Sequence, residues 1–434
     1  MSDVNAARTA HASVVQIIQA AKAAEAGGRR AEAERLLAQA AQLAPTHPAV
    51  LNELGLQMMA RGDAVRAREL FQRATQADPG HPSLWSNLAA ALHALELPEE
   101  MDAIERALAL EPRHLASLLQ KGVLVEAQGD VRGAASIFRN ALAVVASGAP
   151  TPPTMATVLE HARTAVSRDD AALAAALEEG LAAVRTQHGD RVFRRVDKCL
   201  DVLTGKSRVY MPQPTFLHFP QLPVIEFFDT ADFPWAPALE QAAEDIRGEL
   251  TSVLVADRAG LEPYIAYAEG VPLNQWKELN HSRRWSAYFL WNQGASVPAH
   301  LARCPRTAEA LRQIPQCHIA QRGPTAFFSI LDANTHIPAH TGVTNTRLTV
   351  HLPLIVPPEC ELRVGSETRA WIPGQLLAFD DTIEHEAWNR SDTPRAVLIF
   401  DVWNPYLTEA ERDLVRAAVE VVGRYYGSHA AEQA

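Results

Sequence analysis

The chain has 434 residues, which is too long for one small domain, because a domain usually has about 150 residues. It carries 51 acidic and 40 basic side chains and a formal net charge of −11, so it lacks the positive excess of nucleic-acid-binding proteins. No apolar run reaches the roughly 20 residues of a membrane helix, and the first residues do not resemble a secretion signal. Four scattered cysteines without a CxxC pair favour reduced thiols. We therefore expect a cytoplasmic protein with neither nucleic-acid nor membrane partners.

The first 150 residues are rich in Ala, Leu, Glu and Arg and contain an internal repeat. In each unit a glycine comes before a charged stretch and an Ala-rich amphipathic segment, and a proline comes before the next helix. The glycines are Gly28, Gly62 and Gly129, and the prolines, spaced by 34 and 33 residues, are Pro45, Pro79 and Pro112. Small residues let helices cross closely and proline ends a helix, so the pattern predicts stacked helical hairpins. It resembles the tetratricopeptide repeat family, which implies an all-α solenoid over residues 1–150 whose concave groove binds a peptide or protein.

Two details of the repeat lead to further predictions. Leu95 stands where a glycine turn is expected, which makes that unit one residue short. Histidines recur where helices begin, and we expect them to cap these helices (His47, His81 and His114). A plain helical bundle with accidental spacing is the alternative interpretation.

A proline-rich break that begins at Ser147 marks the first predicted domain boundary. Residues 151–206 return to a helix-forming composition and are predicted to be a helical connector. From 207 to 434 the prolines and aromatic residues increase, and residues 346–356 alternate between apolar and polar side chains, which is typical of a strand. Several short strands without intervening helices predict an antiparallel sandwich or jelly roll with flanking helices.

Histidines are the most informative residues of this C-terminal part. His336, His340, His351 and His385 lie within about 50 residues, and neutral imidazole binds iron, zinc, copper and nickel, so a metal site is one interpretation. Structural histidines that bind no metal are the alternative. Arg395 lies ten residues after His385 at the start of a strong strand, and a buried arginine requires an acidic partner, ideally a bidentate carboxylate. Together these residues suggest an iron(II) site that also binds a dicarboxylate co-substrate.

Longer motifs in residues 213–406 resemble the aspartyl/asparaginyl β-hydroxylase family of iron(II)- and 2-oxoglutarate-dependent dioxygenases. They include PheProTrp (233–235), TrpSerAlaTyrPheLeuTrp (285–291), ThrHisIleProAlaHisThrGly (335–342), PheAspAspThrIleGluHisGlu (379–386) and AspValTrpAsnPro (401–405). The resemblance implies a double-stranded β-helix (jelly-roll, cupin-like) domain over residues 207–434. It also implies that Fe(2+), 2-oxoglutarate and O2 take part in the reaction.

The resemblance also implies roles for individual residues. His340 and His385 correspond to the two iron ligands, and Arg395 corresponds to the catalytic-site arginine that pairs with the distal carboxylate of 2-oxoglutarate. Three further residues are implied at the co-substrate: Ser329 assists Arg395, His351 lies beside the other end, and Trp285 lines the pocket. His336 is expected to orient its loop rather than bind metal.

Two positions depart from common patterns. The usual facial triad has a carboxylate two residues after its first histidine, and this chain has Gly342 there. The family shares this loss, although oxygenases that halogenate also place a small residue there, which leaves halogenation as a minor alternative. Many relatives carry an arginine two residues before His351, where this chain has Thr349. Arg347, further along the same strand face, is the candidate substitute, and without it co-substrate anchoring would be weaker.

These observations predict a dioxygenase that hydroxylates an unactivated carbon. By resemblance the target is the β-carbon of an Asp or Asn residue in a peptide or protein docked by the repeat array. A free amino acid or a lipid acyl chain is an alternative substrate, since the fold does not fix the substrate. The alternative from another class is a non-catalytic repeat scaffold with a decayed barrel.

Overall fold

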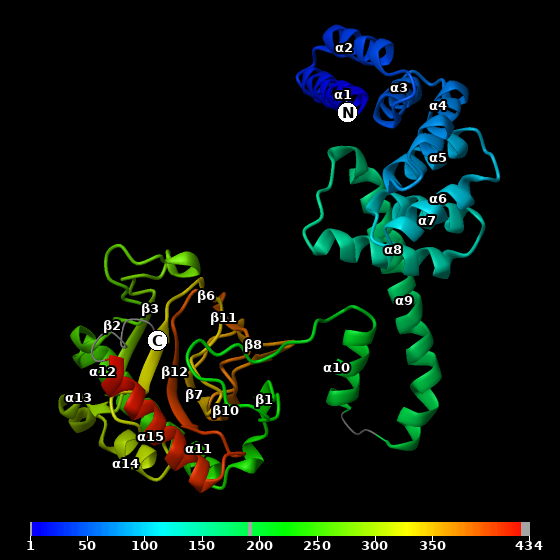
Figure 1. The fold of residues 1–434 in the computed structure, drawn as a ribbon. Helices are drawn as coiled ribbons and strands as arrows, with labels where there is room; N and C mark the ends of the chain where they lie inside the picture. Colours follow the sequence, from blue (N-terminus) through cyan, green and yellow to red (C-terminus); the bar gives the residue numbers. More distant parts are fainter. Residues whose placement is uncertain (1, 190–192, 427–434) are drawn as a thin grey trace. The chain divides into compact units, whose positions relative to one another are not determined.

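The computed structural model describes residues 2–189 and 193–426, and it divides the chain into two compact units, Met1–Phe193 and Arg194–Ala434 (Figure 1). The sequence predicted boundaries at 150 and 206 instead. The observed division reflects packing on both sides of the predicted connector. Leu159 and Ala162 belong to the core of the last repeats, whereas Lys198 forms ion pairs with Glu226 and Glu367 of the second unit.

The first unit consists of helices joined by short turns (Figure 1). The helices are α1 (Ser2–Ala26), α2 (Arg30–Leu43), α3 (Pro48–Ala60), α4 (Ala64–Ala77), α5 (Pro82–Ala94), α6 (Glu100–Leu110), α7 (Leu115–Ala127), α8 (Val131–Ala146) and α9 (Ala156–Gln187). In the hairpins α3–α4 and α7–α8, a glycine of the first helix meets a phenylalanine of the second. A Cβ atom on Gly55 would lie 2.5 Å from the Phe71 ring, and Gly122 faces Phe138 in the same way. The predicted array of repeated helical hairpins is therefore confirmed.

The turns inside the hairpins use left-handed backbone. Gly28, Gly62 and Gly129 have φ values of 72°, 80° and 91°, which glycine adopts without steric cost. Glu96 has a φ of 53° and takes the corresponding place in the third hairpin, whereas Leu95 is the preceding helix cap with a φ of −102°. The interpretation of Leu95 as the turn residue was therefore wrong, since Glu96 keeps the 34-residue spacing from Gly62.

This turn provides a stability test of the array. We expect Glu96→Gly to raise the free energy of unfolding of the full chain by about 1 kcal/mol, because it removes a side chain from left-handed backbone. Urea unfolding of the variant and the parent measures the difference. Leu95→Gly is the matched control and should not stabilise, because Leu95 has a negative φ. A Glu96→Gly protein no more stable than the parent would contradict the assignment.

Two of the three predicted histidine caps are present. The Nδ1 atom of His47 accepts a hydrogen bond from the backbone N–H of Ala49 at 3.2 Å, and that of His114 accepts from Ser117 at 3.4 Å. His81 makes no capping hydrogen bond from its side chain, so the prediction was wrong there. None of the described helices combines the length and the apolar composition needed to cross a membrane.

The second unit contains two sheets, and every pairing between their named strands is antiparallel. The larger sheet has the order β1-β10-β7-β12-β5-β3-β2, with β4 paired to β3, and the smaller has the order β6-β11-β8-β9. The larger sheet comprises β1 (Phe227–Phe228), β2 (Glu262–Pro263), β3 (Trp285–Asn292), β4 (Ala295–Ser296), β5 (Ala326–Leu331), β7 (Arg347–Ile355), β10 (Leu377–Phe379) and β12 (Arg395–Trp403). The smaller sheet comprises β6 (Thr335–His340), β8 (Cys360–Val364), β9 (Glu367–Ala370) and β11 (His385–Asn389). The helices are α10 (Arg194–Leu203), α11 (Ala236–Gln241), α12 (Ala243–Ala256), α13 (Pro298–Arg303), α14 (Pro305–Arg312) and α15 (Glu409–Tyr426).

The two faces of the larger sheet bury different cores. The outer face packs Phe328, Leu352 and Leu398 with Ile246 and Leu250 of α12, which covers this side (Figure 1). The inner face contributes to a second apolar core shared with the smaller sheet, which includes Trp285, Leu331, Val397, Ile337 and Leu362. The predicted alternation of β7 is confirmed, because its even-numbered leucine and valine positions lie in the outer core. The predicted all-α solenoid followed by an antiparallel β domain with flanking helices is also confirmed.

Candidate active site

The structure brings together the two histidines that were predicted to bind iron. His340 ends β6 and His385 begins β11, and the two residues are paired directly across these strands. Their ring centroids are 4.0 Å apart. A β-bulge lies just beyond this pair, where Glu386 alone opposes Pro338 and Ala339 of β6. In a regular strand, residues three apart point to opposite faces. The extra residue of the bulge puts Ile337 and His340 on the same, inward face, because a bulge changes the direction of the side chains beside it.

Hydrogen bonds fix which ring nitrogen of each histidine is free. His340 Nδ1 lies 2.8 Å from the carbonyl oxygen of Pro338, and His385 Nδ1 lies 3.1 Å from that of Ile383. A carbonyl only accepts, so each Nδ1 carries the proton and each Nε2 keeps its lone pair. Burial lowers the pKa of His340 to about 3, with a further contribution from His385, and burial lowers the pKa of His385 to about 4. Both rings are therefore neutral at pH 7, which is the form that binds a metal ion.

Arg395 is a buried cation without an acidic partner in the described part of the chain. Its side chain is 1% exposed, and its Nε and Nη1 atoms make no hydrogen bond. Its guanidinium lies 4.5 Å from the centre of the Trp371 ring. Burial lowers the pKa of Arg395 to about 10, so the group is still charged at pH 7. An unpaired buried guanidinium is costly, and a carboxylate is the partner that would satisfy it.

Two predicted co-substrate residues, Trp285 and Ser329, share the inner face of the larger sheet with Arg395. Trp285 and Arg395 both pair with Leu331, while Ser329 pairs with Val397 of the same strand as Arg395. Trp285 Nε1 donates a hydrogen bond of 3.0 Å to Ser329 Oγ. This leaves the Ser329 hydroxyl proton free to donate to a ligand.

His351 also lies on this inner face, opposite Ile399 of β12. Trp371 Nε1 donates to its Nδ1 at 3.2 Å, so Nε2 carries the proton of the neutral ring. Burial lowers the pKa of His351 well below its ordinary value, and the Arg395 charge lowers it further. The neutral His351 ring could therefore donate a hydrogen bond from Nε2 to an anionic ligand.

Arg347 is not placed with the other predicted co-substrate residues. It pairs with Trp403, at the far end of β12 from Arg395. Its Nη1 donates to Asp401 Oδ2 at 2.8 Å and to the Arg322 carbonyl oxygen at 3.3 Å. The charge of Arg347 is therefore already balanced by an acidic neighbour.

Thr349 and Gly342 meet at one carboxylate. Thr349 Oγ1 donates to Asp381 Oδ2 at 3.1 Å, and the Gly342 N–H donates to the Asp381 carbonyl at 2.6 Å. A Cβ atom on Gly342 would overlap the Asp381 carboxylate. Asp381 therefore fills the space beside Gly342, the position at which a facial triad has its acidic residue. Within residues 2–189 and 193–426 no cluster of three or more His, Cys, Asp or Glu side chains is placed to hold an ion.

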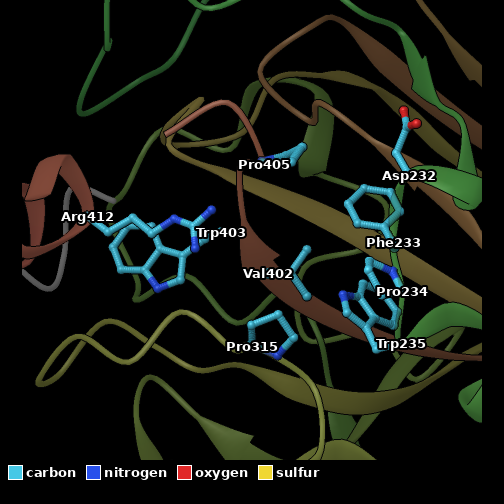
Figure 2. A pocket seen from close by; sticks show the side chains of 9 residues that line it. All are labelled: Asp232, Phe233, Pro234, Trp235, Pro315, Val402, Trp403, Pro405 and Arg412. Carbon is cyan, nitrogen blue, oxygen red and sulfur yellow. The ribbon is translucent and has the colours of Figure 1, made fainter. Parts of the chain in front are cut away.

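A cavity of about 500 Å³ lies elsewhere in the second unit and includes none of the predicted site residues. Its walls are mainly aromatic and proline side chains, and Figure 2 shows Asp232 and Arg412 on opposite sides of it. The lining residues are Asp232, Phe233, Pro234, Trp235, Pro315, Val402, Trp403, Pro405 and Arg412. No histidine, cysteine or hydroxyl side chain is among these lining residues.

Comparison with known proteins finds a family match within the second unit. Residues 240–405 match the family described as "Aspartyl/Asparaginyl beta-hydroxylase". The chain is therefore similar to this family over residues 240–405. The matched segment contains both histidines and Arg395, so the similarity covers the whole candidate site.

Three relatives illustrate the range of similar proteins. The chain is 38% identical to human "Aspartyl/asparaginyl beta-hydroxylase" over 146 residues, which are 33% of this chain and 19% of that protein. It is 36% identical to "Ornithine lipid ester-linked acyl 2-hydroxylase" of Rhizobium tropici over 186 residues, 42% of this chain and 62% of that protein. It is 32% identical to human "Aspartate beta-hydroxylase domain-containing protein 2" over 211 residues, 48% of this chain and 54% of that protein. The chain thus spans less than two thirds of each of these relatives.

Sequence reasoning did not identify two residues that contact the site, or the acidic partner of Arg347. Trp371 lies against Arg395 and donates to His351. The Trp276 ring lies 4.9 Å from the His340 ring, and Asp401 pairs with Arg347. The only signal for Trp371 was its place just before a Pro-Gly turn, which says nothing about its partners. The contacts of all three join segments far apart in the sequence.

Proposed function

We propose that the protein is an iron(II)- and 2-oxoglutarate-dependent dioxygenase that hydroxylates an unactivated carbon. One observation supports this above all: two neutral imidazoles with free Nε2 atoms share a site with a buried guanidinium that has no acidic partner in the described part of the chain. Imidazole nitrogens suit iron(II), and the guanidinium suits a carboxylate, so the donor set fits both groups. In the proposed reaction the substrate C–H, 2-oxoglutarate and O2 give the alcohol, succinate and CO2.

The residues of this chain would bind and orient the reactants. His340 and His385 would hold the iron, which with 2-oxoglutarate would supply the activation of dioxygen. Arg395 would bind the distal carboxylate of 2-oxoglutarate, and the Ser329 hydroxyl would donate to the same group. His351 would donate from Nε2 to the other end of the co-substrate. Trp285 and Trp371 hold Ser329 and His351 in these orientations through their indole N–H groups.

The proposed target is the β-carbon of an Asp or Asn residue in a peptide or protein bound by the repeat array. A relative named for this reaction supports the proposal. Docking would raise the local concentration of the substrate at the catalytic domain. A lipid acyl chain is a second candidate, because another relative is named as an acyl 2-hydroxylase.

Succinate formation tests the catalytic proposal. Purified protein with iron(II) should convert 2-oxoglutarate to succinate, and chelation of the iron should stop the conversion. A wild-type protein that binds no iron and forms no succinate would instead favour the non-catalytic scaffold.

Deletion of the array tests the docking proposal. A chain that lacks residues 1–193 should lose far more hydroxylation of a protein substrate than of a short peptide, because only the protein would use the groove. Equal losses on both substrates, or none, would contradict docking. A proteome-wide search for +16 Da mass shifts that disappear when the gene is deleted would supply the substrate.

A further inference from the structure

The carboxylates on either side of His385 meet at a single guanidinium. Arg363 lies on β8, where it pairs with Glu386 of β11. Its Nε donates to Glu386 Oε1 at 2.6 Å, and its Nη2 donates to Glu384 Oε1 at 3.0 Å. Its Nη1 donates to the Gly365 carbonyl oxygen at 2.7 Å. All three nitrogens of this guanidinium are therefore used, and two of them hold the neighbours of His385.

The same network reaches the strand that carries His340. Glu386 Oε2 accepts a hydrogen bond of 2.9 Å from Nε2 of His336, which lies on β6. The His336 ring is parallel to that of Trp388 on β11, with a centroid distance of 5.2 Å. Arg363 and Glu386 thus connect β8, β11 and β6 through side chains.

Glu384 has a second basic partner from a distant segment. Arg208 Nη2 donates to both of its carboxylate oxygens, at 2.8 and 2.9 Å. The Arg208 guanidinium lies 4.5 Å from the centre of the Tyr210 ring, and that of Arg363 lies 5.7 Å from it. The side chain of Arg208 is 65% exposed and that of Arg363 is 17% exposed, so Arg363 is the better-fixed partner.

The backbone explains why side chains are needed here. The pairing of β11 with β6 shifts between His385 and Ala387, at Glu386. The ladder of hydrogen bonds is disrupted at a bulge, so it constrains the two strands less at this point. The pairing of β11 with β8 runs without a shift from His385 to Asn389. Arg363 therefore lies on β8, whose pairing with β11 is regular, and it can anchor Glu386 at the bulge in the β11–β6 pairing.

Resting on the proposed function, we propose that Arg363 is a positioning residue for the iron site. It holds Glu384 and Glu386 and so fixes the direction of the His385 ring between them. Through Glu386 and His336 it also fixes the strand that carries His340. Groups that orient metal ligands change metal affinity by roughly 10- to 100-fold when they are replaced. A lysine could not reproduce this role, because it lacks the planar fork that binds two carboxylates and a carbonyl.

Cobalt(II) binding to the full-length protein tests this role without turnover. We expect Arg363→Met to weaken Co(II) binding by about 10- to 100-fold in titration calorimetry and to change the visible Co(II) spectrum. Arg363→Lys should give an intermediate loss. The matched control is Arg390→Met, which removes the 2.6 Å ion pair between Arg390, the residue just after β11, and Glu361 of β8, away from His385. It should keep the wild-type affinity and spectrum.

The outcomes separate this proposal from the proposed function. Wild-type affinity and spectrum in Arg363→Met, or equal losses in Arg363→Met and Arg390→Met, would overturn the positioning role while leaving the iron site intact. A wild-type protein that binds no Co(II) would overturn the iron site itself, and the positioning role with it. If Arg363→Met does not fold, Glu386→Gln serves instead, because it keeps the side-chain shape. It should weaken Co(II) binding several-fold, and unchanged binding would overturn the proposal.

Discussion

Replacing either His340 or His385 by alanine should abolish succinate formation and weaken iron(II) binding more than about 100-fold. Each histidine supplies one of two imidazoles, and the described part of the chain offers no cluster of three or more donors that could compensate. A loss of this size exceeds the roughly 10- to 100-fold effect of changing a group that only orients a ligand. Calorimetric titration with Fe(II) under nitrogen and a succinate assay measure the two effects.

The control for this experiment is His161→Ala in the first unit. His161 lies on α9, far along the sequence from the histidine pair, and its Nε2 atom lies beside Glu126. The variant should keep wild-type iron binding and succinate formation. This result would show that the loss of an arbitrary histidine does not impair iron binding or turnover. Wild-type turnover by both His340→Ala and His385→Ala would exclude this pair as the iron site.

Arg395→Met should separate co-substrate binding from stability. We expect the KM for 2-oxoglutarate to rise at least about 100-fold, because a bidentate charged pair with the distal carboxylate is lost. We also expect the free energy of unfolding of the ligand-free protein to rise by about 1–4 kcal/mol, because methionine fills much of the same volume without a buried charge. Activity and stability would thus change in opposite directions.

The sign of the stability change follows from the pKa. Arg395 has a pKa of about 10 in the folded protein, below its ordinary value of 12.5, so folding disfavours its charged form. This penalty is fully present below pH 10 and disappears only as the pH rises from about 10 to 12.5. At pH 7 the parent therefore carries the whole penalty and Arg395→Met carries none.

Thermal denaturation at pH 7 with and without 2-oxoglutarate measures both effects. The parent should be stabilised by the ligand in proportion to RT ln(1 + [L]/Kd), and the variant should show a higher ligand-free midpoint with little response. Arg390→Met, which removes an exposed ion pair, should change neither quantity much. A lower ligand-free midpoint in Arg395→Met would mean that Arg395 has a partner that stabilises the fold.

Much of the fold was predictable from the sequence because it depends on local periodicity. The 34-residue recurrence of small residues predicted the helical hairpins, and the alternation in residues 346–356 predicted β7. The exception at Glu96 shows the limit of this reasoning. Glycine is only the preferred residue in left-handed backbone, so a glutamate there is invisible to a search for glycine.

The pairing of His340 with His385 was expected from motif resemblance, and the coordinates place the two rings 4.0 Å apart. The reason that the His340 ring faces inward together with Ile337 is the bulge in β6 opposite Glu386, and no residue type in β6 or β11 predicts it. The same holds for Arg347. The sequence correctly predicted that Arg347 lies on the polar face of β7. Its ion pair with Asp401 could not be predicted, because it depends on which strand lies beside β7.

The sequence by itself determined the repeat period and the strand alternation, because these are properties of neighbouring residues. The candidate site residues came from motif resemblance. Only the tertiary structure decided that Arg395 has no acidic partner among the described residues, and that His340 and His385 carry their protons on Nδ1. It also decided that Arg363 joins the two glutamates around His385. These features depend on burial and on contacts between strands distant in the chain. A charge is costly or harmless according to what surrounds it, and only the folded chain defines those surroundings.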